Sequence, residues 1–255
     1  MEINKIYNEN CLDTMARMPN DFVDLAVTSP PYDNLRTYNN YTFNFEPIAK
    51  ELFRVIKQGG VVVWIVGDAT INGSETGTSF KQALYFKEIG FNLHDTMAWE
   101  KTNPMPKVKT KRYFDVFEYM FIFSKGQPKT FNPIQQKCKL GGKEYNSTCK
   151  KITTGKERVK KCFILNTHRN KNNIWQIAIA QNKTDHPAVF PEQLANDHII
   201  SWSNPGDLVY DPFMGSGTTA KTAILNKRNF VGSEISKEYC EIAEKRINEL
   251  SAVLF

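Results

Sequence analysis

The stretch Val23-Asp24-Leu25-Ala26-Val27-Thr28-Ser29-Pro30-Pro31-Tyr32 joins an apolar run to a polar turn. The apolar run predicts a short buried strand. A hydroxyl, two prolines and an aromatic ring follow at its carboxyl end, where open α/β sheets bind their ligands. Because each proline fixes its own φ and lacks an N–H, the turn is stiff and offers carbonyls as acceptors. An ordinary strand-ending turn is the alternative interpretation.

This turn carries groups that suit a planar ring with an exocyclic amine. The Ser29 hydroxyl and the Pro30 carbonyl can hold the amine, and the ring of Tyr32 offers a flat face for stacking. We therefore predict a pocket for such a ring at Ser29, Pro30, Pro31 and Tyr32.

A second motif lies near the other end of the chain. A strand over 207–210 enters Asp211-Pro212-Phe213-Met214-Gly215-Ser216-Gly217-Thr218-Thr219, and a helix over 220–226 and a strand ending in Glu234 follow. This order is typical of a nucleotide-type pocket, in which glycines let a ligand approach the backbone and the acid binds ribose hydroxyls. The turn lacks the lysine of a phosphate-binding loop, which disfavours a triphosphate.

A cofactor with an adenosine and an amino-acid tail fits this second motif better. Asp211 can pair with the ammonium of such a tail. The amino end of the helix near Thr218 and Thr219 can bind its carboxylate.

Apolar strands alternate with amphipathic helices along most of the chain. The pattern predicts strands near 3–7, 23–27, 61–68, 91–100, 116–124, 173–177, 207–210 and 230–234, and helices near 12–18, 45–57, 78–89, 191–201, 220–226 and 237–250. We expect Gly59-Gly60 to end the second helix. This alternation favours an α/β fold, a Rossmann-like, doubly wound and mainly parallel sheet.

Residues 125–173 interrupt this alternation. They are rich in Lys, Asn, Thr and Gly and show no sustained periodicity. From Lys101 to Lys171 there are 18 basic and 4 acidic residues, whereas the rest of the chain has 15 and 23. We therefore predict a body made of 1–124 and 174–255, with a basic insertion at 125–173 that contacts a polyanion. A solubilising loop is the alternative.

Composition narrows the cellular setting. No apolar run reaches the roughly 18 residues of a membrane span, and the first residues do not form a secretory signal. The five cysteines, an odd number, favour a reducing compartment, so we expect a cytoplasmic protein. Cys138, Cys149, Cys162 and His168 lie in the insertion, but no C-x2-C pair occurs, and we expect no metal.

Together these motifs resemble the S-adenosylmethionine-dependent DNA amino-methyltransferases of the beta class. The order is the same: catalytic motif first, target-recognition insertion in the middle, cofactor motif last. Asn10-Cys11 stands where the family usually has Asp-Cys, and Trp99–Pro104 and His186-Pro187-Ala188 also look like family motifs. The resemblance implies S-adenosylmethionine as cofactor and a binding set of Asn10, Cys11, Asp211, Phe213, Gly215, Gly217, Thr218, Thr219, Glu234 and His186.

The resemblance also implies the reaction, with Ser29, Pro30, Pro31 and Tyr32 as the catalytic tetrapeptide. A Ser-first tetrapeptide is associated mostly with cytosine N4 methylation, and adenine N6 stays open. The target base would be rotated out of the duplex, and the methyl transfer would be direct. Cytosine C5 chemistry needs a cysteine nucleophile, commonly in a Pro-Cys pair, and none of the 12 prolines precedes a cysteine.

Double-stranded DNA is the expected partner of this chain. The candidate contacts are Arg36, Tyr38, Lys101, Asn103, Lys107, Lys109, Lys111, Arg112, Lys139, Lys143, Arg158 and Arg169. The sequence leaves open a cognate restriction endonuclease and a homodimer. The alternatives are a methyltransferase acting on RNA or on a protein amide, a DNA-binding protein without activity, and a nicotinamide dehydrogenase, which the motifs fit poorly.

Overall fold

The computed structural model describes residues 1–31, 43–104, 111–150, 158–179 and 191–254. The chain divides into two compact units. The larger unit contains Met1–Asn132 and Asn173–Phe255, and the smaller one is Pro133–Asn172. We describe each unit by itself.

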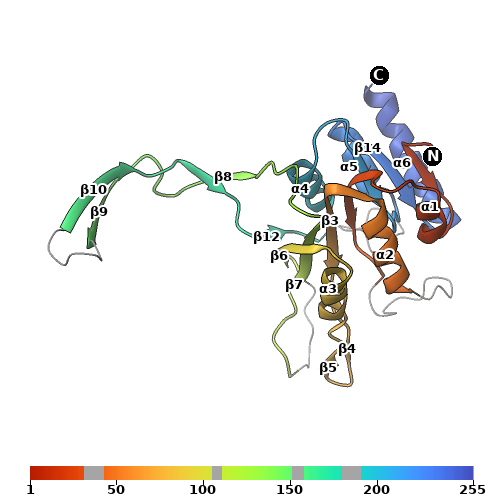
Figure 1. Cartoon of the computed structure of the whole chain (residues 1–255), viewed down its shortest axis with the longest axis horizontal. Coiled ribbons are helices and arrows are strands. Elements are labelled where there is room, and N and C mark those ends of the chain that lie inside the picture. Colours follow the sequence, from red (N-terminus) through yellow and green to blue (C-terminus); the bar gives the residue numbers. More distant parts are fainter. Residues whose placement is uncertain (32–42, 105–110, 151–157, 180–190, 255) are drawn as a thin grey trace. The chain divides into compact units, whose positions relative to one another are not determined.

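An eight-stranded sheet forms the centre of the larger unit (Figure 1). Its strand order is β1-β14-β13-β2-β3-β7-β6-β12. All neighbours are parallel except β7, which is antiparallel to both β3 and β6. The predicted α/β fold with a mainly parallel sheet is therefore confirmed. The strands are β1 (Lys5–Tyr7), β2 (Val23–Thr28), β3 (Ile56–Val66), β6 (Asn92–Lys101), β7 (Phe117–Ser124), β12 (Ile174–Ile177), β13 (Leu208–Asp211) and β14 (Asn229–Ser233).

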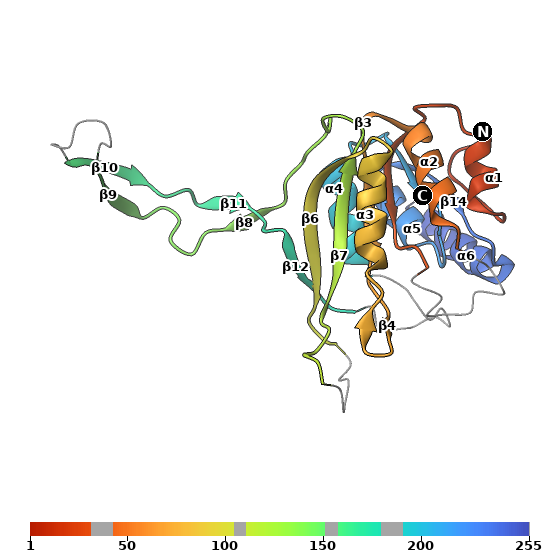
Figure 2. The same ribbon diagram turned by 60° about the horizontal axis from the view of Figure 1, so that its bottom comes forward.

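Six helices of the described residues cover this sheet. They are α1 (Cys11–Ala16), α2 (Phe45–Val55), α3 (Thr78–Glu88), α4 (Glu192–Trp202), α5 (Thr218–Leu225) and α6 (Lys237–Leu254). The crossovers through α1, α2 and α3 run in one direction across the sheet, and those through α4 and α5 run in the opposite direction. Because such crossovers are right-handed, the two groups lie on opposite faces (Figure 2). Accordingly, α1 packs on α2, and α4 packs on α5.

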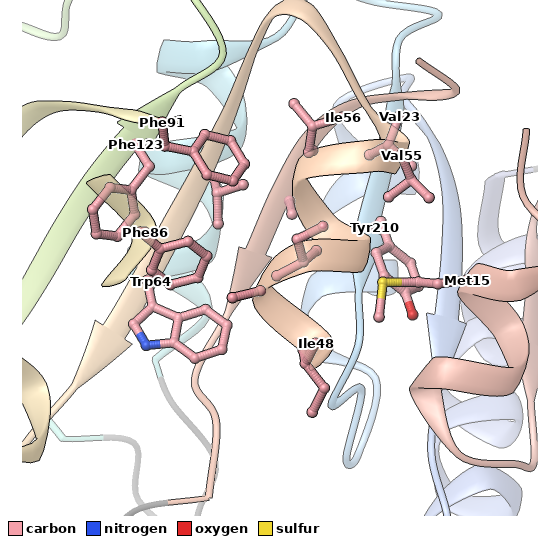
Figure 3. Packing of buried hydrophobic residues seen from close by; sticks show 14 of the residues in the cluster. Met15, Val23, Ile48, Val55, Ile56, Trp64, Phe86, Phe91, Phe123 and Tyr210 are labelled. Atoms are coloured by element: carbon pink, nitrogen blue, oxygen red, sulfur yellow. The ribbon is translucent and has the colours of Figure 1, made fainter. Parts of the chain in front are cut away.

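The main apolar core lies between the sheet and the layer of α1, α2 and α3. Ile48, Leu52 and Val55 recur at helical spacing along α2 and are buried. In Figure 3, the rings of Trp64 and Phe86 lie together on one side of the cluster; their centroids are 5.2 Å apart. The buried indole N–H of Trp64 donates to Gln82 Oε1 at 2.8 Å, so this polar group of the core is satisfied.

Two local predictions about the body were wrong or incomplete. Helix α2 ends at Val55, and Gly59-Gly60 lies inside β3, in a bulge where the pairing with β2 shifts register. Gly59 has a φ of 81°, which explains a glycine at this bulge. A hairpin of β4 (Thr70–Ile71) and β5 (Ser74–Glu75) was not predicted. Its turn residues Asn72 and Gly73 have φ of 51° and 82°, the conformation that an Asn-Gly pair signals.

The smaller unit contains two antiparallel ladders. Strand β8 (Gln135–Lys137) pairs with β11 (His168–Asn170), and β9 (Glu144–Lys150) pairs with β10 (Arg158–Ile164). We had expected no regular structure here. All side chains of β11 are exposed, so no buried face imposes an alternating apolar pattern on this strand.

Among the described helices, none has the length and apolar character required to cross a bilayer.

Candidate active site at the carboxyl ends of β2 and β13

The two sequence motifs end neighbouring strands of the sheet. Strands β2 and β13 are parallel, with Val209 opposite Leu25 and Tyr210 opposite Ala26. From β2 the chain proceeds to β3 on one side, and from β13 it proceeds to β14 on the other. The strand order therefore reverses between them, which makes this edge the switch point at which open α/β sheets bind ligands.

Asp211 links these two strand ends. Its side chain is buried, with 1% of its surface exposed. Thr28 Oγ1 donates to Oδ1 at 2.6 Å, and Thr219 Oγ1 donates to Oδ2 at 2.6 Å. The Phe213 amide also donates to Oδ1, at 3.0 Å. Burial raises the pKa of Asp211 to about 6, although all three hydrogen bonds favour the ionised form.

The pairing of Asp211 with the ammonium of the cofactor's amino-acid tail stays a prediction. The contacts above show that both carboxylate oxygens already have donors within the protein. The Asp211 carboxylate therefore links the end of β2 to the loop after β13 and to the first turn of α5.

Glu234 organises the glycine-rich loop from the next strand. Gly215 N donates to its Oε2 at 2.9 Å, and Ser236 N donates to its Oε1 at 2.8 Å. Burial raises the pKa of this carboxyl, against the effect of these backbone hydrogen bonds. Each oxygen keeps a further lone pair, so two ribose hydroxyls remain compatible acceptor partners. The ribose role stays a prediction.

The two glycines of the loop adopt left-handed conformations, with φ of 51° at Gly215 and 82° at Gly217. At Gly217 a Cβ would lie 2.8 Å from the Cβ of Ala243 in α6. Gly217 thus lets the start of α5 approach α6 closely. That is a packing reason for the glycine, which differs from the close approach of a ligand that we had predicted.

Thr218 supplies the buried polar atom that best fits a ligand at this loop. Only 3% of its surface is exposed, and its Oγ1 has no hydrogen-bond partner among the described residues. It is the first residue of α5, whose amino end carries unpaired N–H groups and a positive dipole. A carboxylate could accept from both, so these residues fit the amino-acid end of the expected cofactor.

Asn10 and Cys11 begin α1 next to the end of β1. Asn10 is the N-cap of this helix, and its Oδ1 accepts from Leu12 N at 2.9 Å. Cys11 is buried, and its carbonyl accepts weakly from the Tyr210 hydroxyl at 3.5 Å. Contact of either residue with a cofactor stays a prediction.

The structure describes the predicted catalytic turn as far as Pro31. Ser29 and Pro31 are half-buried and Pro30 is buried, directly after Thr28. Tyr32, Arg36, Tyr38, Lys107, Lys109 and His186 lie outside the described residues.

Three predicted DNA contacts have partners within the body. Lys101 Nζ lies 2.7 Å from Glu118 Oε1, so the charge of this lysine is compensated. Asn103 Oδ1 accepts from Ile179 N at 2.6 Å. Arg112 pairs with Glu75 at 2.8 Å. These partners compete with a phosphate, and the DNA role of all three stays a prediction.

The other predicted DNA contacts divide between the units. Lys111 is exposed on the body. Lys139, Lys143 and Arg169 are exposed on the smaller unit, and Arg158 begins β10. In the described part of the chain, no group of three or more His, Cys, Asp or Glu side chains could hold a metal ion.

Sequence reasoning missed the roles of Thr28 and of the Tyr210–Ser233 pair. The Tyr210 hydroxyl lies 2.9 Å from Ser233 Oγ, and burial raises the pKa of Tyr210 well above its usual value. For Thr28, the available signal was a hydroxyl at the last position of an otherwise apolar strand. Such a residue needs a partner when buried, and the partner comes from a distant segment.

Comparison with known proteins gives consistent matches over most of the chain. A family model for N6/N4 enzymes, described as DNA methylase, matches residues 23–245. The orphan methyltransferase M.BamHII of Bacillus amyloliquefaciens is 56% identical over 235 residues, which cover 88% of both chains. The type II methyltransferase M.BglII of Bacillus subtilis is 28% identical, covering 94% of this chain and 68% of that protein. The solved PvuII DNA methyltransferase (cytosine-N4-specific) superposes with a TM-score of 0.71 at 22% identity, covering 95% of this chain and 85% of that one.

Proposed function

The chain belongs to the N6/N4 DNA methylase family, and from that premise we propose that it transfers a methyl group from S-adenosylmethionine to cytosine N4 in double-stranded DNA. The observation that carries this proposal is the shared edge of β2 and β13. The predicted catalytic turn follows Thr28 and the glycine-rich loop follows Asp211, at the ends of two adjacent strands. A hydrogen bond of 2.6 Å from Thr28 to Asp211 joins these two strand ends.

S-adenosylmethionine as methyl donor is supported by the chemistry of the loop after β13. Thr218 offers a buried hydroxyl and the amino end of α5 for a carboxylate. Glu234 offers acceptors at the tip of the next strand. A solved relative of 25% identity, M1.HpyAVI, is a complex with this cofactor, covering 95% of this chain with a TM-score of 0.62.

The chain's own residues would orient the acceptor amine. S-adenosylmethionine supplies an electrophilic methyl group on a sulfonium sulfur. Ser29 and the Pro30 carbonyl would hold the two hydrogens of the base amine and direct its lone pair toward that methyl. The serine hydroxyl is too weak a base to take a proton early, so the amine loses its proton to water after the N–C bond has formed.

Cytosine N4 is favoured over adenine N6 by the first residue of the tetrapeptide. Ser29 places a neutral hydroxyl where the adenine enzymes of this family typically have Asp or Asn. The hydroxyl presents one acceptor oxygen and can also donate, and it brings no charge to the base pocket.

The test is to identify the modified base directly. DNA from cells that express the protein is digested to nucleosides and analysed by mass spectrometry, with cells carrying a Ser29→Ala variant as control. We expect N4-methylcytosine in the first sample only. If N6-methyladenine is found instead, the protein is a DNA methyltransferase but its target is adenine. If the DNA is unmodified and the methyl group is found in RNA or protein, the proposal is overturned.

A further inference from the structure

We propose that Thr28 is a positioning residue that, through Asp211, holds the Ser29 turn in register with the cofactor loop. This inference rests on the proposed function and deepens it, because it assigns a role to a residue outside the catalytic tetrapeptide. Thr28 itself touches neither the base nor the methyl donor in this proposal.

Thr28 is placed to control Ser29. It is the last residue of β2 and is completely buried, and Ser29 follows it directly. Its Oγ1 donates to Asp211 Oδ1 at 2.6 Å, a length typical of a charge-assisted O–H···O⁻ hydrogen bond. A shift of the Thr28 backbone would therefore move the catalytic hydroxyl with it.

The other side of Asp211 holds the cofactor loop. Thr219 Oγ1 in the first turn of α5 donates to Oδ2 at 2.6 Å, and the Phe213 amide donates to Oδ1 at 3.0 Å. One buried carboxylate thus connects the end of β2, the start of the loop and the helix that follows. The partners of the carboxylate are two hydroxyls and an amide, each with a fixed direction.

Backbone pairing fixes Thr28 against Trp64 of β3 and Asp211 against Gly232 of β14, but the ladder between β2 and β13 does not reach this point. Residues of β13 and β2 pair at Val209 with Leu25 and at Tyr210 with Ala26. Beyond Ala26 the strands continue toward their respective motifs, and the side-chain bond from Thr28 to Asp211 joins them there. Without it, the two strand ends would keep their fold but lose the link nearest to the reacting groups.

Removal of the Thr28 hydroxyl should therefore affect the rate more than binding. Misplacement of reacting groups by about 1 Å can cost about 100-fold in rate. The loop residues that hold the cofactor would keep their contacts from Thr219 and Phe213. We expect a lower kcat with a nearly unchanged affinity for the cofactor.

The experiment compares Thr28→Val, Thr28→Ser and a matched control in the whole 255-residue chain. Thr28→Val keeps the shape and removes the hydroxyl, and Thr28→Ser keeps the hydroxyl. The control is Thr222→Val, because the buried Thr222 hydroxyl donates to the carbonyls of Thr218 and Thr219 within its own helix. Steady-state transfer of labelled methyl to duplex DNA gives kcat and KM, and calorimetry gives the Kd of S-adenosylmethionine.

For Thr28→Val we expect kcat to fall by about 10- to 100-fold, with the cofactor Kd within about threefold of wild type. Thr28→Ser should restore kcat, and Thr222→Val should match wild type. The inference is overturned if Thr28→Val keeps full kcat, if Thr28→Ser is as slow as Thr28→Val, or if cofactor affinity falls as much as kcat. If Thr28→Val does not fold, Thr28→Ala replaces it under the same criteria. A wild type that transfers no methyl to DNA refutes the proposed function instead.

Discussion

The carboxyl edge of β2 and β13 and the smaller unit, Pro133–Asn172, use polar side chains in opposite ways. At the edge, Asp211 is buried and each of its oxygens accepts from a side chain or amide of the body. On the insertion, Lys139, Lys143 and Arg169 are exposed on a unit of two short ladders. The first arrangement fixes groups before any ligand arrives. The second presents charge that a ligand can reach.

The burial of its polar groups therefore indicates the kind of function that each region can perform. Buried hydrogen bonds in a low-dielectric interior are directional and costly to break, so they suit the positioning of reacting groups. Exposed cations are screened and adaptable, so they suit a phosphate backbone. Substitutions in the two regions test this difference, and they follow from the largest expected effect to the smallest.

Replacing Ser29 with alanine tests the reacting end of the buried edge. We expect methyl transfer to fall by about 100- to 1,000-fold, because one group that orients the amine is lost. Cofactor affinity should stay within about threefold of wild type, since the loop after Asp211 is untouched. Labelled-methyl transfer and calorimetry measure the two quantities. The control is Ser74→Ala on the exposed hairpin; wild-type rates in both variants would contradict the assignment.

The Asp211→Asn substitution tests the cost of the buried carboxylate. Its pKa is about 6 in the folded protein against 3.8 in a model compound, so the folded state binds more protons between these values. The free energy of unfolding of the wild type therefore falls as pH rises from 4 to 6, by about 2 kcal/mol from this group. Asparagine stays neutral. Relative to wild type, Asp211→Asn should gain up to about 2.5 kcal/mol between pH 4 and pH 7.5 in denaturant titrations. An equal difference at both pH values would contradict this.

Exchanging Glu234 for glutamine tests the acid at the tip of β14. The amide loses the charge and one acceptor, while Gly215 N can still donate to the remaining oxygen. We expect the Kd of S-adenosylmethionine to rise by about 10- to 100-fold, the range for hydrogen bonds to a charged group. Calorimetry measures it. The matched control is Glu192→Gln. In the wild type, the Glu192 carboxylate pairs with Lys221 and Arg246. Unchanged affinity in Glu234→Gln would remove the ribose role.

The smallest effects are expected on the insertion. Replacing Lys139 and Lys143 with alanine should weaken DNA binding by less than tenfold at physiological salt and equally for all sequences. If each lysine neutralises one phosphate, the slope of log K against log salt should decrease by about 1 for each lysine. Fluorescence anisotropy over a salt series measures this slope. The control is the double variant Lys237→Ala and Lys245→Ala on α6. If both double variants reduce the slope equally, the lysines of the insertion contribute no more to DNA binding than those of α6.

The sequence predicted the parts of the site that follow buried strands. Apolar runs located the ends of β2 and β13, and the alternation of elements placed them in one parallel sheet. It did not predict the hydrogen bond from Thr28 to Asp211, because that contact joins residues 183 positions apart and depends on the strand order. Nor did it explain Gly217, whose neighbour Ala243 lies on a helix that only the fold brings near.

Exposed or paired polar residues were harder to predict. The signal of Asn72-Gly73 was present in the sequence, and the hairpin it forms could have been found. The pairing of Lys101 with Glu118 depends on the register of β6 and β7, which composition does not contain. Strands β8 and β11 consist of polar residues that are mostly exposed, so they show no apolar period and were not predicted.

The most direct test is a crystal structure of the protein with S-adenosylhomocysteine, the product of methyl transfer. We predict the ribose hydroxyls on Glu234, the carboxylate at Thr218, and the sulfur facing Ser29 with no side chain between them. An adenosine bound away from Gly215 and Glu234, or a sulfur turned away from Ser29, would contradict a single methyl-transfer site at the ends of β2 and β13.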